Sequence, residues 1–128
     1  MIALDASVMI AVLDPQDAHF DAARQIFVGN ASHRLIAHRL NLAEALVLAT
    51  RRNTGGEAAS ALIALGVVAS DRLDDAEQLA GLRVNTSLPM PDCCLLHLAL
   101  RERAGIATFD RRLAAAARAV GVAVVGAA

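Results

Sequence analysis

The chain has 128 residues, of which 56% are hydrophobic, 20% are charged and 2% are aromatic. This length suits one domain, and the hydrophobic content is sufficient for a sizeable core, which excludes an intrinsically disordered protein. The formal net charge of −1 argues against a broad basic surface for nucleic acid, and the scarcity of aromatic residues argues against RNA-binding modules that stack bases on aromatic side chains.

Short apolar runs alternate with longer segments of helical periodicity along the whole chain. The apolar runs predict strands over residues 1–4, 33–37, 67–69, 106–108 and 122–125. The periodic segments predict helices over residues 6–13, 17–28, 39–52, 54–66, 71–82, 92–103 and 111–120. Because the strands are short, nearly all apolar and alternate with helices, the sequence predicts an α/β fold: one domain over residues 1–128, with about five parallel strands and helices on both faces.

Four acidic residues occupy positions where carboxylates are unusual. Asp5 and Asp110 follow predicted strands, at the sheet edge where parallel α/β proteins hold their sites. Glu44 and Asp92 share helical faces with leucines and other apolar residues, and a buried carboxylate is costly unless it is paired or bound to a metal. Each acid also has a structural interpretation. Asp5, Asp92 and Asp110 could cap helices, and Glu44 could form a salt bridge.

Convergence of all four acids on one sheet edge would require a counter-charge, because like charges a few ångströms apart repel. Oxygen ligands without His or Cys favour Mg²⁺ or Mn²⁺ over Zn²⁺, and these ions support phosphodiester hydrolysis. If four of the thirteen acidic residues bind metal, the remaining nine are outnumbered by twelve arginines, which suit phosphate binding. Arg111 and Arg112 follow Asp110 directly and could contact RNA phosphates, although two exposed helix arginines are an equally good interpretation.

The chain resembles the PIN-domain ribonucleases, in particular the VapC toxins of type II toxin–antitoxin pairs, over essentially its whole length. That family opens with a strand, an Asp and a nearby Ser or Thr, and ALDASVMIAVL provides Asp5 and Ser7 in this pattern. Its second acid lies in a helical phrase similar to NLAEAL, which contains Glu44. Its third heads a helix similar to PDCCLLHLAL, which begins near Asp92.

The fourth acid of the family follows a strand in the pattern T-x-D, matched by Thr108 and Asp110. Residues 53–88 carry no distinctive signature of the family. The resemblance implies a Mg²⁺- or Mn²⁺-dependent endoribonuclease, usually dimeric and held inactive by a cognate antitoxin. It implies that the four acids are the catalytic and metal-binding residues, while Ser7 and Thr108 could orient ligands or water or simply bond to the local backbone.

Two other functions remain open on the sequence. One is a PIN-like binding or regulatory module without activity, against which the presence of all four acids counts. The other is a Mg²⁺-dependent phosphotransfer domain that uses Asp5 as nucleophile. Enzymes of that kind are expected to carry a lysine near the phosphoryl group, whereas every basic residue of this chain is an arginine.

Several absences predict a cytoplasmic protein. The apolar N-terminal segment lacks a basic leader, and the longest uncharged run, residues 58–70, has 13 residues, whereas a membrane span needs about 18. The adjacent Cys93 and Cys94 suit neither a disulfide nor a metal site, so we expect small packing residues. The histidines lack ligand spacing and are expected at solvated or edge positions: His19, His33, His38 and His97.

The N-terminal helices predict an interaction surface. The mean hydropathy of +0.48 is high for a small monomer. The segment 6–28 holds more apolar side chains than one core-facing stripe needs, namely Val8, Met9, Val12, Leu13, Phe20, Ile26, Phe27 and Val28. We therefore expect some of these side chains to form an exposed apolar patch or groove, through which the chain forms a homodimer and binds a small antitoxin that blocks access to the acids.

Overall fold

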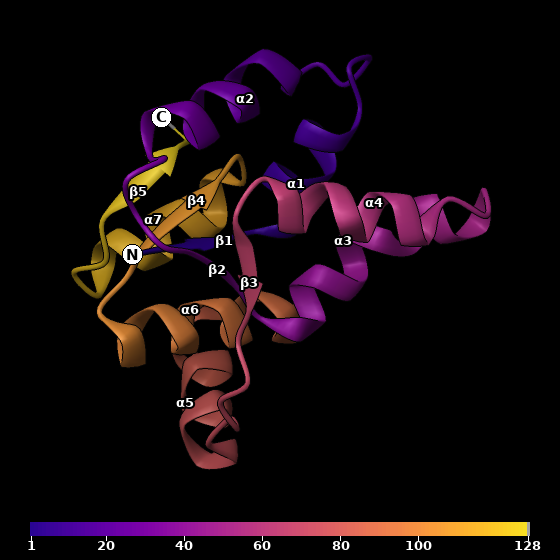
Figure 1. Cartoon of the computed structure of the whole chain (residues 1–128). Coiled ribbons are helices and arrows are strands. Elements are labelled where there is room, and N and C mark those ends of the chain that lie inside the picture. The colour runs from indigo at the N-terminus through magenta and orange to yellow at the C-terminus, as the bar shows by residue number, and fades with distance from the viewer. Residues whose placement is uncertain (128) are drawn as a thin grey trace.

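Five short strands form one parallel sheet in the computed structural model, which describes residues 1–127 (Figure 1). In chain order the strands are β1 (Ile2–Leu4), β2 (Leu35–Ala37), β3 (Val67–Ala69), β4 (Gly105–Thr108) and β5 (Val124–Gly126). Their order across the sheet is β3-β2-β1-β4-β5, and all neighbours are parallel. The predicted α/β class is confirmed, and the first strand lies at the centre of the sheet.

Helices cover both faces of this sheet. They are α1 (Ala6–Leu13), α2 (Phe20–Gly29), α3 (Arg39–Arg51), α4 (Gly55–Ala64), α5 (Ala76–Thr86), α6 (Met90–Glu102) and α7 (Arg111–Ala119). In Figure 1, α3 and α4 extend together away from the sheet, and α5 lies against α6. No helix in the described part of the chain is both long and apolar enough to cross a membrane.

Two hydrophobic cores lie on opposite faces of the sheet. Along β1, Ile2 and Leu4 pack into the core formed with α1 to α4, whereas Ala3 packs into the core formed with α6 and α7. Successive side chains of a strand point to opposite faces, so a central strand covered on both sides is apolar at every position. This explains why the strands appear in the sequence as continuous apolar runs.

One helix begins later than its sequence pattern predicts. The helix expected over residues 17–28 begins at Phe20. The residues before it form turns, in which the carboxylates of Asp14 and Asp17 accept hydrogen bonds from backbone N–H groups two residues further on, at 2.9 and 2.8 Å. Such local side-chain bonds compete with helix formation and delay the helix start.

A larger difference concerns α5, which was expected over residues 71–82. Its first turn is fixed by Asp75, whose carboxylate accepts a hydrogen bond from the Gln78 N–H at 3.0 Å. At its other end, Ser87 adopts a left-handed conformation with φ of 58°. The helix is thus shifted by about one turn relative to the pattern, since residues 72–75 are occupied in hydrogen bonds with other elements.

Candidate active site

The connections that follow β1 and β4 diverge at the carboxyl edge of the sheet. From β1 the chain leads to α1 on one face, and from the neighbouring β4 it leads to α7 on the other. This arrangement is where parallel α/β folds form their binding crevices. Asp5 directly follows β1 and is 7% exposed, and Asp110 follows β4 with one residue between them.

Two hydroxyl groups hold the Asp5 carboxylate. Ser7 Oγ and Thr108 Oγ1 each donate to Asp5 Oδ2 at 2.7 Å. Both hydroxyl oxygens also accept from the backbone that follows β4, because the Phe109 N–H donates to Ser7 Oγ at 3.2 Å and the Asp110 N–H donates to Thr108 Oγ1 at 3.0 Å. Ser7 and Thr108 therefore join the two strand ends and leave Asp5 Oδ1 free.

Glu44 and Asp92 reach the same region from α3 and α6. Asp92 lies in the first turn of α6 and is half-buried. Glu44 is exposed, so the sequence argument that placed it on a buried face was wrong. Its presumed apolar neighbours on α3 are also exposed, by 40%, 47% and 48% for Leu40, Val47 and Leu48 respectively.

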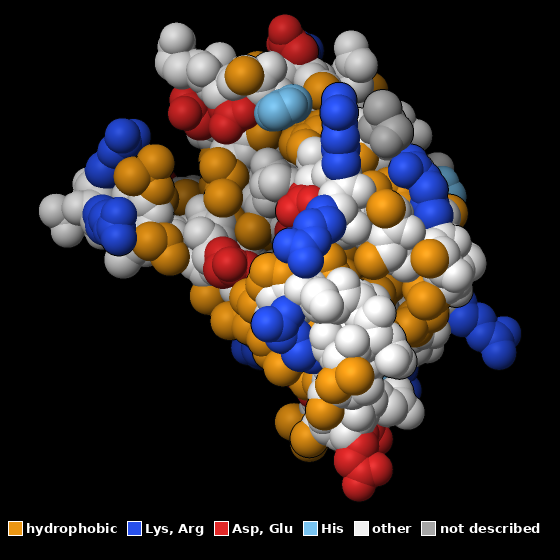
Figure 2. Space-filling model, turned by 180° about the vertical axis from the view of Figure 1, so that it is seen from behind, with side chains coloured by type: hydrophobic (Ala, Val, Ile, Leu, Met, Phe, Trp, Pro, Cys, Tyr) orange, Lys and Arg blue, Asp and Glu red, His pale blue; other side chains and the backbone are white. Residues whose placement is uncertain are grey.

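The electrostatics of Asp92 connect all four acids. The pKa of Asp92 is raised from 3.8 to about 6, mainly by burial and further by the charges of Asp5, Asp110 and Glu44, against the opposing effect of Arg112. Asp5, Asp110 and Glu44 therefore all lie within electrostatic reach of Asp92. Figure 2 shows acidic side chains in the hollow between the projecting α3–α4 part and the rest of the molecule, with arginines beside them.

The capping interpretation holds for one of the four acids. Asp110 Oδ1 accepts from the N–H groups of Arg112 and Leu113 at 2.8 and 3.1 Å, and so caps α7. Asp5 stands at the N-cap position of α1, but its side chain makes no capping bond. Asp92 lies within α6, so it is not a cap.

The donor set suits a hard divalent cation. Among residues 1–127, no protein donor contacts Asp5 Oδ1, Asp110 Oδ2, Glu44 Oε2 or either oxygen of Asp92. No three of these acids have oxygen atoms that all lie within 4.8 Å of one another in the described chain. Oxygen-only donors are the ligands that Mg²⁺ and Mn²⁺ prefer, and Mg²⁺ usually binds few carboxylates directly and keeps several waters.

Comparison with protein families decides the classification. The family model described as the PIN domain matches residues 2–119, almost the whole chain. The chain belongs to the PIN-domain family. A comparison with curated proteins gives no match.

Three solved structures share the fold of this PIN domain. VapC20 from Mycobacterium tuberculosis, described as a toxin that cleaves the sarcin–ricin loop, is 18% identical with a TM-score of 0.70, over 91% of this chain and 95% of that one. PAE2754 from Pyrobaculum aerophilum is 21% identical with a TM-score of 0.64, over 97% and 83%. FitAcB from Neisseria gonorrhoeae is 17% identical with a TM-score of 0.66, over 97% and 96%.

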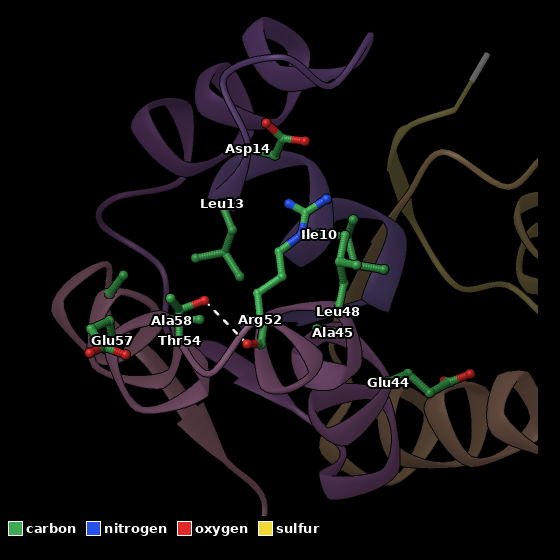
Figure 3. Close-up of a pocket in the computed structure, with 12 residues that line it drawn as sticks. Ile10, Leu13, Asp14, Glu44, Ala45, Leu48, Arg52, Thr54, Glu57 and Ala58 are labelled. Atoms are coloured by element: carbon green, nitrogen blue, oxygen red, sulfur yellow. Dashed lines mark hydrogen bonds between the residues drawn. The ribbon is translucent and has the colours of Figure 1, made fainter.

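An apolar groove adjoins the acid cluster of the PIN domain (Figure 3). It lies between α1 and the α3–α4 pair and has a volume of about 490 Å³. Its apolar lining includes Ile10, Leu13 and Leu48, and Glu44 lies at its edge. The groove thus connects exposed apolar surface with one of the four carboxylates.

The apolar surface predicted within residues 6–28 is confirmed for Leu13, which lines the groove, and for the exposed Val28, but it is wrong for four of the other side chains. Val8 and Met9 are completely buried, and Ile26 and Phe27 are nearly so, because α1 and α2 both pack into the core on their face of the sheet. Val12, Leu13 and Phe20 are partly buried, and Val28 is exposed. The apolar surface near α1 is instead provided by Ile10 and Leu13, where they face α3 and α4.

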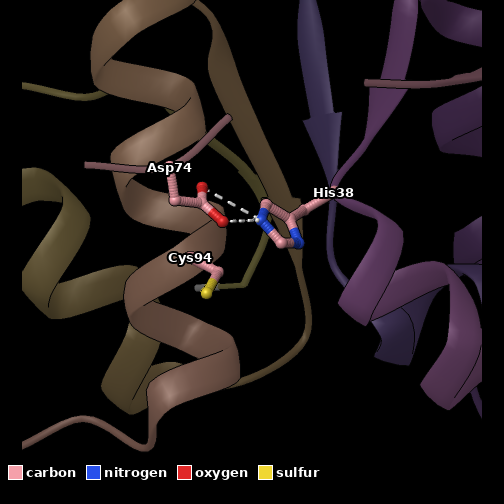
Figure 4. Close-up of side chains that lie close together, drawn as sticks. All are labelled: His38, Asp74 and Cys94. Atoms are coloured by element: carbon pink, nitrogen blue, oxygen red, sulfur yellow. Dashed lines mark hydrogen bonds and ion pairs between the residues drawn. The ribbon is translucent and has the colours of Figure 1, made fainter. Parts of the chain in front are cut away.

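A second cluster of polar side chains was not predicted from the sequence (Figure 4). His38 Nε2 lies 2.9 and 3.1 Å from the two carboxylate oxygens of Asp74, and Cys94 Sγ completes a trio with ligand atoms within 4.8 Å of one another. The Leu40 N–H donates to His38 Nδ1 at 3.0 Å, so Nε2 carries the proton and donates to Asp74. Arg101 lies 3.6 Å from the same carboxylate.

This trio links α3, α6 and the segment before α5 through the His38–Asp74 hydrogen bond and the Asp74–Arg101 ion pair. Burial, followed by the Asp74 charge, raises the pKa of the Cys94 thiol and disfavours a thiolate ligand. His38 is half-buried and His97 is buried, so the expectation that the histidines are solvated is wrong for His97. His97 Nε2 accepts from the Asp75 N–H at 3.3 Å, a contact between residues 22 positions apart that no local sequence pattern reveals. Both cysteines are buried packing residues, as expected.

Proposed function

We propose that this PIN domain is a Mg²⁺- or Mn²⁺-dependent endoribonuclease and the toxin of a type II toxin–antitoxin pair. The observation that carries this proposal is the gathering of Asp5, Glu44, Asp92 and Asp110 at the carboxyl edge of β1 and β4, each with an oxygen that no protein donor uses. The description of VapC20 as an RNA-cleaving toxin supports it by similarity of fold.

The four acids would hold the cation, which supplies Lewis-acid polarisation of a phosphoryl oxygen and activates water. Ser7 and Thr108 occupy Asp5 Oδ2 and so leave Oδ1 as the oxygen for the cation. The first turn of α7 fixes Asp110 in the same way. These contacts preorganise two of the carboxylates before any substrate binds.

Arg112 is the better placed of the two predicted phosphate-binding arginines. Its charge acts on Asp92, and its guanidinium donates to the Ser87 carbonyl at 3.2 Å, which holds the side chain beside the acid cluster. Arg111 is exposed and forms no ion pair in the described chain. We therefore propose that Arg112, rather than Arg111, contacts an RNA phosphate.

The groove between α1, α3 and α4 would bind the antitoxin. Its apolar floor suits one face of an amphipathic helix, and its rim carries Asp14, Glu44 and Glu57 against Arg52, which favours a partner with basic side chains. A segment seated there would lie against Glu44 and obstruct the acid cluster. We also expect a homodimer, which light scattering at micromolar concentration would test.

RNA cleavage by the purified chain tests the proposed function. Total cellular RNA is incubated with Mg²⁺, with Mn²⁺ or with EDTA, and the cleavage ends are mapped. We expect cleavage with either metal and none with EDTA. Asp5→Asn and Asp92→Asn should each reduce the rate by at least about 100-fold, because a ligand should matter more than the residues that orient it.

Asp21→Asn is the matched control, because Asp21 is an exposed acid on α2 outside the cluster. It should cleave RNA like the wild type. Full activity in Asp5→Asn would show that Asp5 is not a residue of the active site. A wild type that binds RNA with either metal but never cleaves it would favour the inactive binding module instead.

A further inference from the structure

Asn41 is a fully buried polar side chain in the interface between α3 and α6. It lies one helical turn before Glu44, and its exposed fraction is 0%. The small residue at the next inward-facing position of α3, Ala45, is also buried. Burying an amide at such a helix interface is unfavourable unless its hydrogen bonds are satisfied, so its presence calls for an explanation.

The Asn41 amide connects the two acids that are carried by helices. Its Nδ2 donates to the Pro91 carbonyl oxygen at 3.2 Å and approaches Glu44 Oε1 at 3.5 Å. Pro91 immediately precedes Asp92 in the first turn of α6. One amide group therefore joins the main chain that carries Asp92 to the carboxylate of Glu44. Among residues 1–127, Glu44 has no other hydrogen-bond partner.

The other half of the same amide is unsatisfied. Asn41 Oδ1 is buried and accepts no hydrogen bond from any of residues 1–127. An unpaired buried acceptor destabilises a protein, and an apolar residue of similar size would avoid that penalty. The Pro91 carbonyl does not depend on Asn41, because it lies within α6. The side chain is thus placed for its Nδ2 contacts at the expense of stability.

We propose that Asn41 is a positioning residue that fixes the separation of Glu44 and Asp92 and thereby strengthens the binding of a divalent cation to the acid cluster. This inference rests on the proposed function. Asn41 acts through Glu44 and the Pro91 main chain and does not itself bind the cation. Glu44 is exposed on a helix, so without the Asn41 contact its flexible side chain would sample several rotamers and would lose conformational entropy on binding.

The affinity for Mn²⁺, measured by titration calorimetry without RNA, tests this role. Asn41→Leu should weaken Mn²⁺ binding by about 10-fold or more, the usual effect of removing a group that orients a metal ligand. Its melting temperature in EDTA should equal or exceed that of the wild type, since the unpaired Oδ1 is removed. If Asn41→Leu does not fold, Asn41→Ala serves in the same titration.

Two further variants separate positioning from general loosening. His97→Leu removes another buried polar side chain, from α6 but outside the acid cluster, and should leave Mn²⁺ affinity unchanged. In the Glu44→Gln background, Asn41→Leu should lower the Mn²⁺ affinity much less than it does in the wild type, because the effects of substitutions at coupled residues are not additive.

The outcomes distinguish this inference from the function on which it rests. Equal Mn²⁺ affinity of wild type and Asn41→Leu would overturn the positioning role alone. So would a lower melting temperature with unchanged affinity, which would make Asn41 a structural residue. Failure of the wild type to bind Mn²⁺, or unchanged binding in Asp5→Asn, would overturn the proposed metal site and this inference with it.

Discussion

Asp92 is the acid of the cluster whose surroundings least favour a negative charge in the absence of metal. Burial is the main reason, and no protein donor in the described chain contacts its oxygens. The neighbouring carboxylates add repulsion, and Arg112 offsets only part of it. A site with this imbalance is stabilised by a cation, because the cation removes the repulsion that the fold itself leaves unresolved.

This imbalance predicts a pH-dependent stability of the metal-free protein. The pKa of Asp92 is about 6 in the fold and 3.8 without it, so its contribution is fully present below pH 4 and is lost as the pH rises through 6. In EDTA at pH 8, Asp92→Asn should melt a few degrees above the wild type, which corresponds to about 1 kcal/mol after allowance for solvent screening.

At pH 4 the two melting temperatures should differ less, because Asp92 is then protonated in the folded wild type and partly protonated in the unfolded wild type. Thermal melts across this pH range, with Asp21→Asn as the exposed-acid control, measure the difference. An advantage of Asp92→Asn that is equal at pH 4 and pH 8 would show that repulsion at Asp92 is not its cause.

The sequence identified the four acids partly through position and partly through family resemblance. Asp5 and Asp110 were accessible to physical reasoning, because the ends of apolar runs reveal the sheet edge. Glu44 was assigned on a wrong premise: α3 buries Asn41 and Ala45, whereas the apolar residues taken to share a buried face with Glu44 are exposed. Helical periodicity shows that faces differ, but it does not show which face meets α6 when small and polar residues form the contact.

At the scale of elements, the segment between β3 and α5 shows how distant contacts override a local pattern. The Asp74 carboxylate bonds to His38 at the start of α3 and lies beside Arg101 of α6, whose guanidinium also donates to the Leu73 carbonyl. The separations along the chain are 36 residues for His38 and Asp74, 27 for Asp74 and Arg101, and 28 for Leu73 and Arg101, so no short window of sequence contains these pairs. Strands and long helices were predictable because their periodicity is local.

This cluster predicts that Asp74 stabilises the fold and takes no part in catalysis. Asp74→Ala should lower the free energy of unfolding by about 1–3 kcal/mol, less than a fully buried pair would lose, because the Asp74 side chain is 27% exposed. Removing it also leaves the Arg101 charge without its partner. Urea unfolding measures the loss of unfolding free energy. At urea concentrations below the unfolding transition, the variant should cleave RNA at close to the wild-type rate.

Asp71→Ala is the control, since Asp71 is an exposed acid of the same connection and forms no ion pair in residues 1–127. It should leave stability nearly unchanged. A Zn²⁺-dependent increase in melting temperature that disappears in Cys94→Ser would contradict the ion-pair interpretation, because it would show that His38, Asp74 and Cys94 bind metal.

At the scale of the whole molecule, the acid cluster and the apolar groove are parts of one surface. The α3 helix provides Glu44 to the cluster and Leu48 to the groove, one turn apart. A partner bound in the groove would therefore contact the element that carries a candidate metal ligand. Composition indicated excess apolar surface, but its location depended on how α1 and α2 pack, and that packing buries Met9 and Phe27.

Two exposed apolar residues provide a matched test of where the antitoxin binds. Leu48 is 48% exposed and lines the groove, whereas Val28 is 70% exposed on α2 outside it. Both positions tolerate Asp without damage to the core, so both variants should fold. With the co-expressed cognate antitoxin, Leu48→Asp should weaken binding by about 30-fold, or about 2 kcal/mol, because a carboxylate would be buried without a partner. Val28→Asp should bind like the wild type. The opposite result would move the antitoxin to α2, the other helix of the predicted region 6–28, and would leave the groove without a partner.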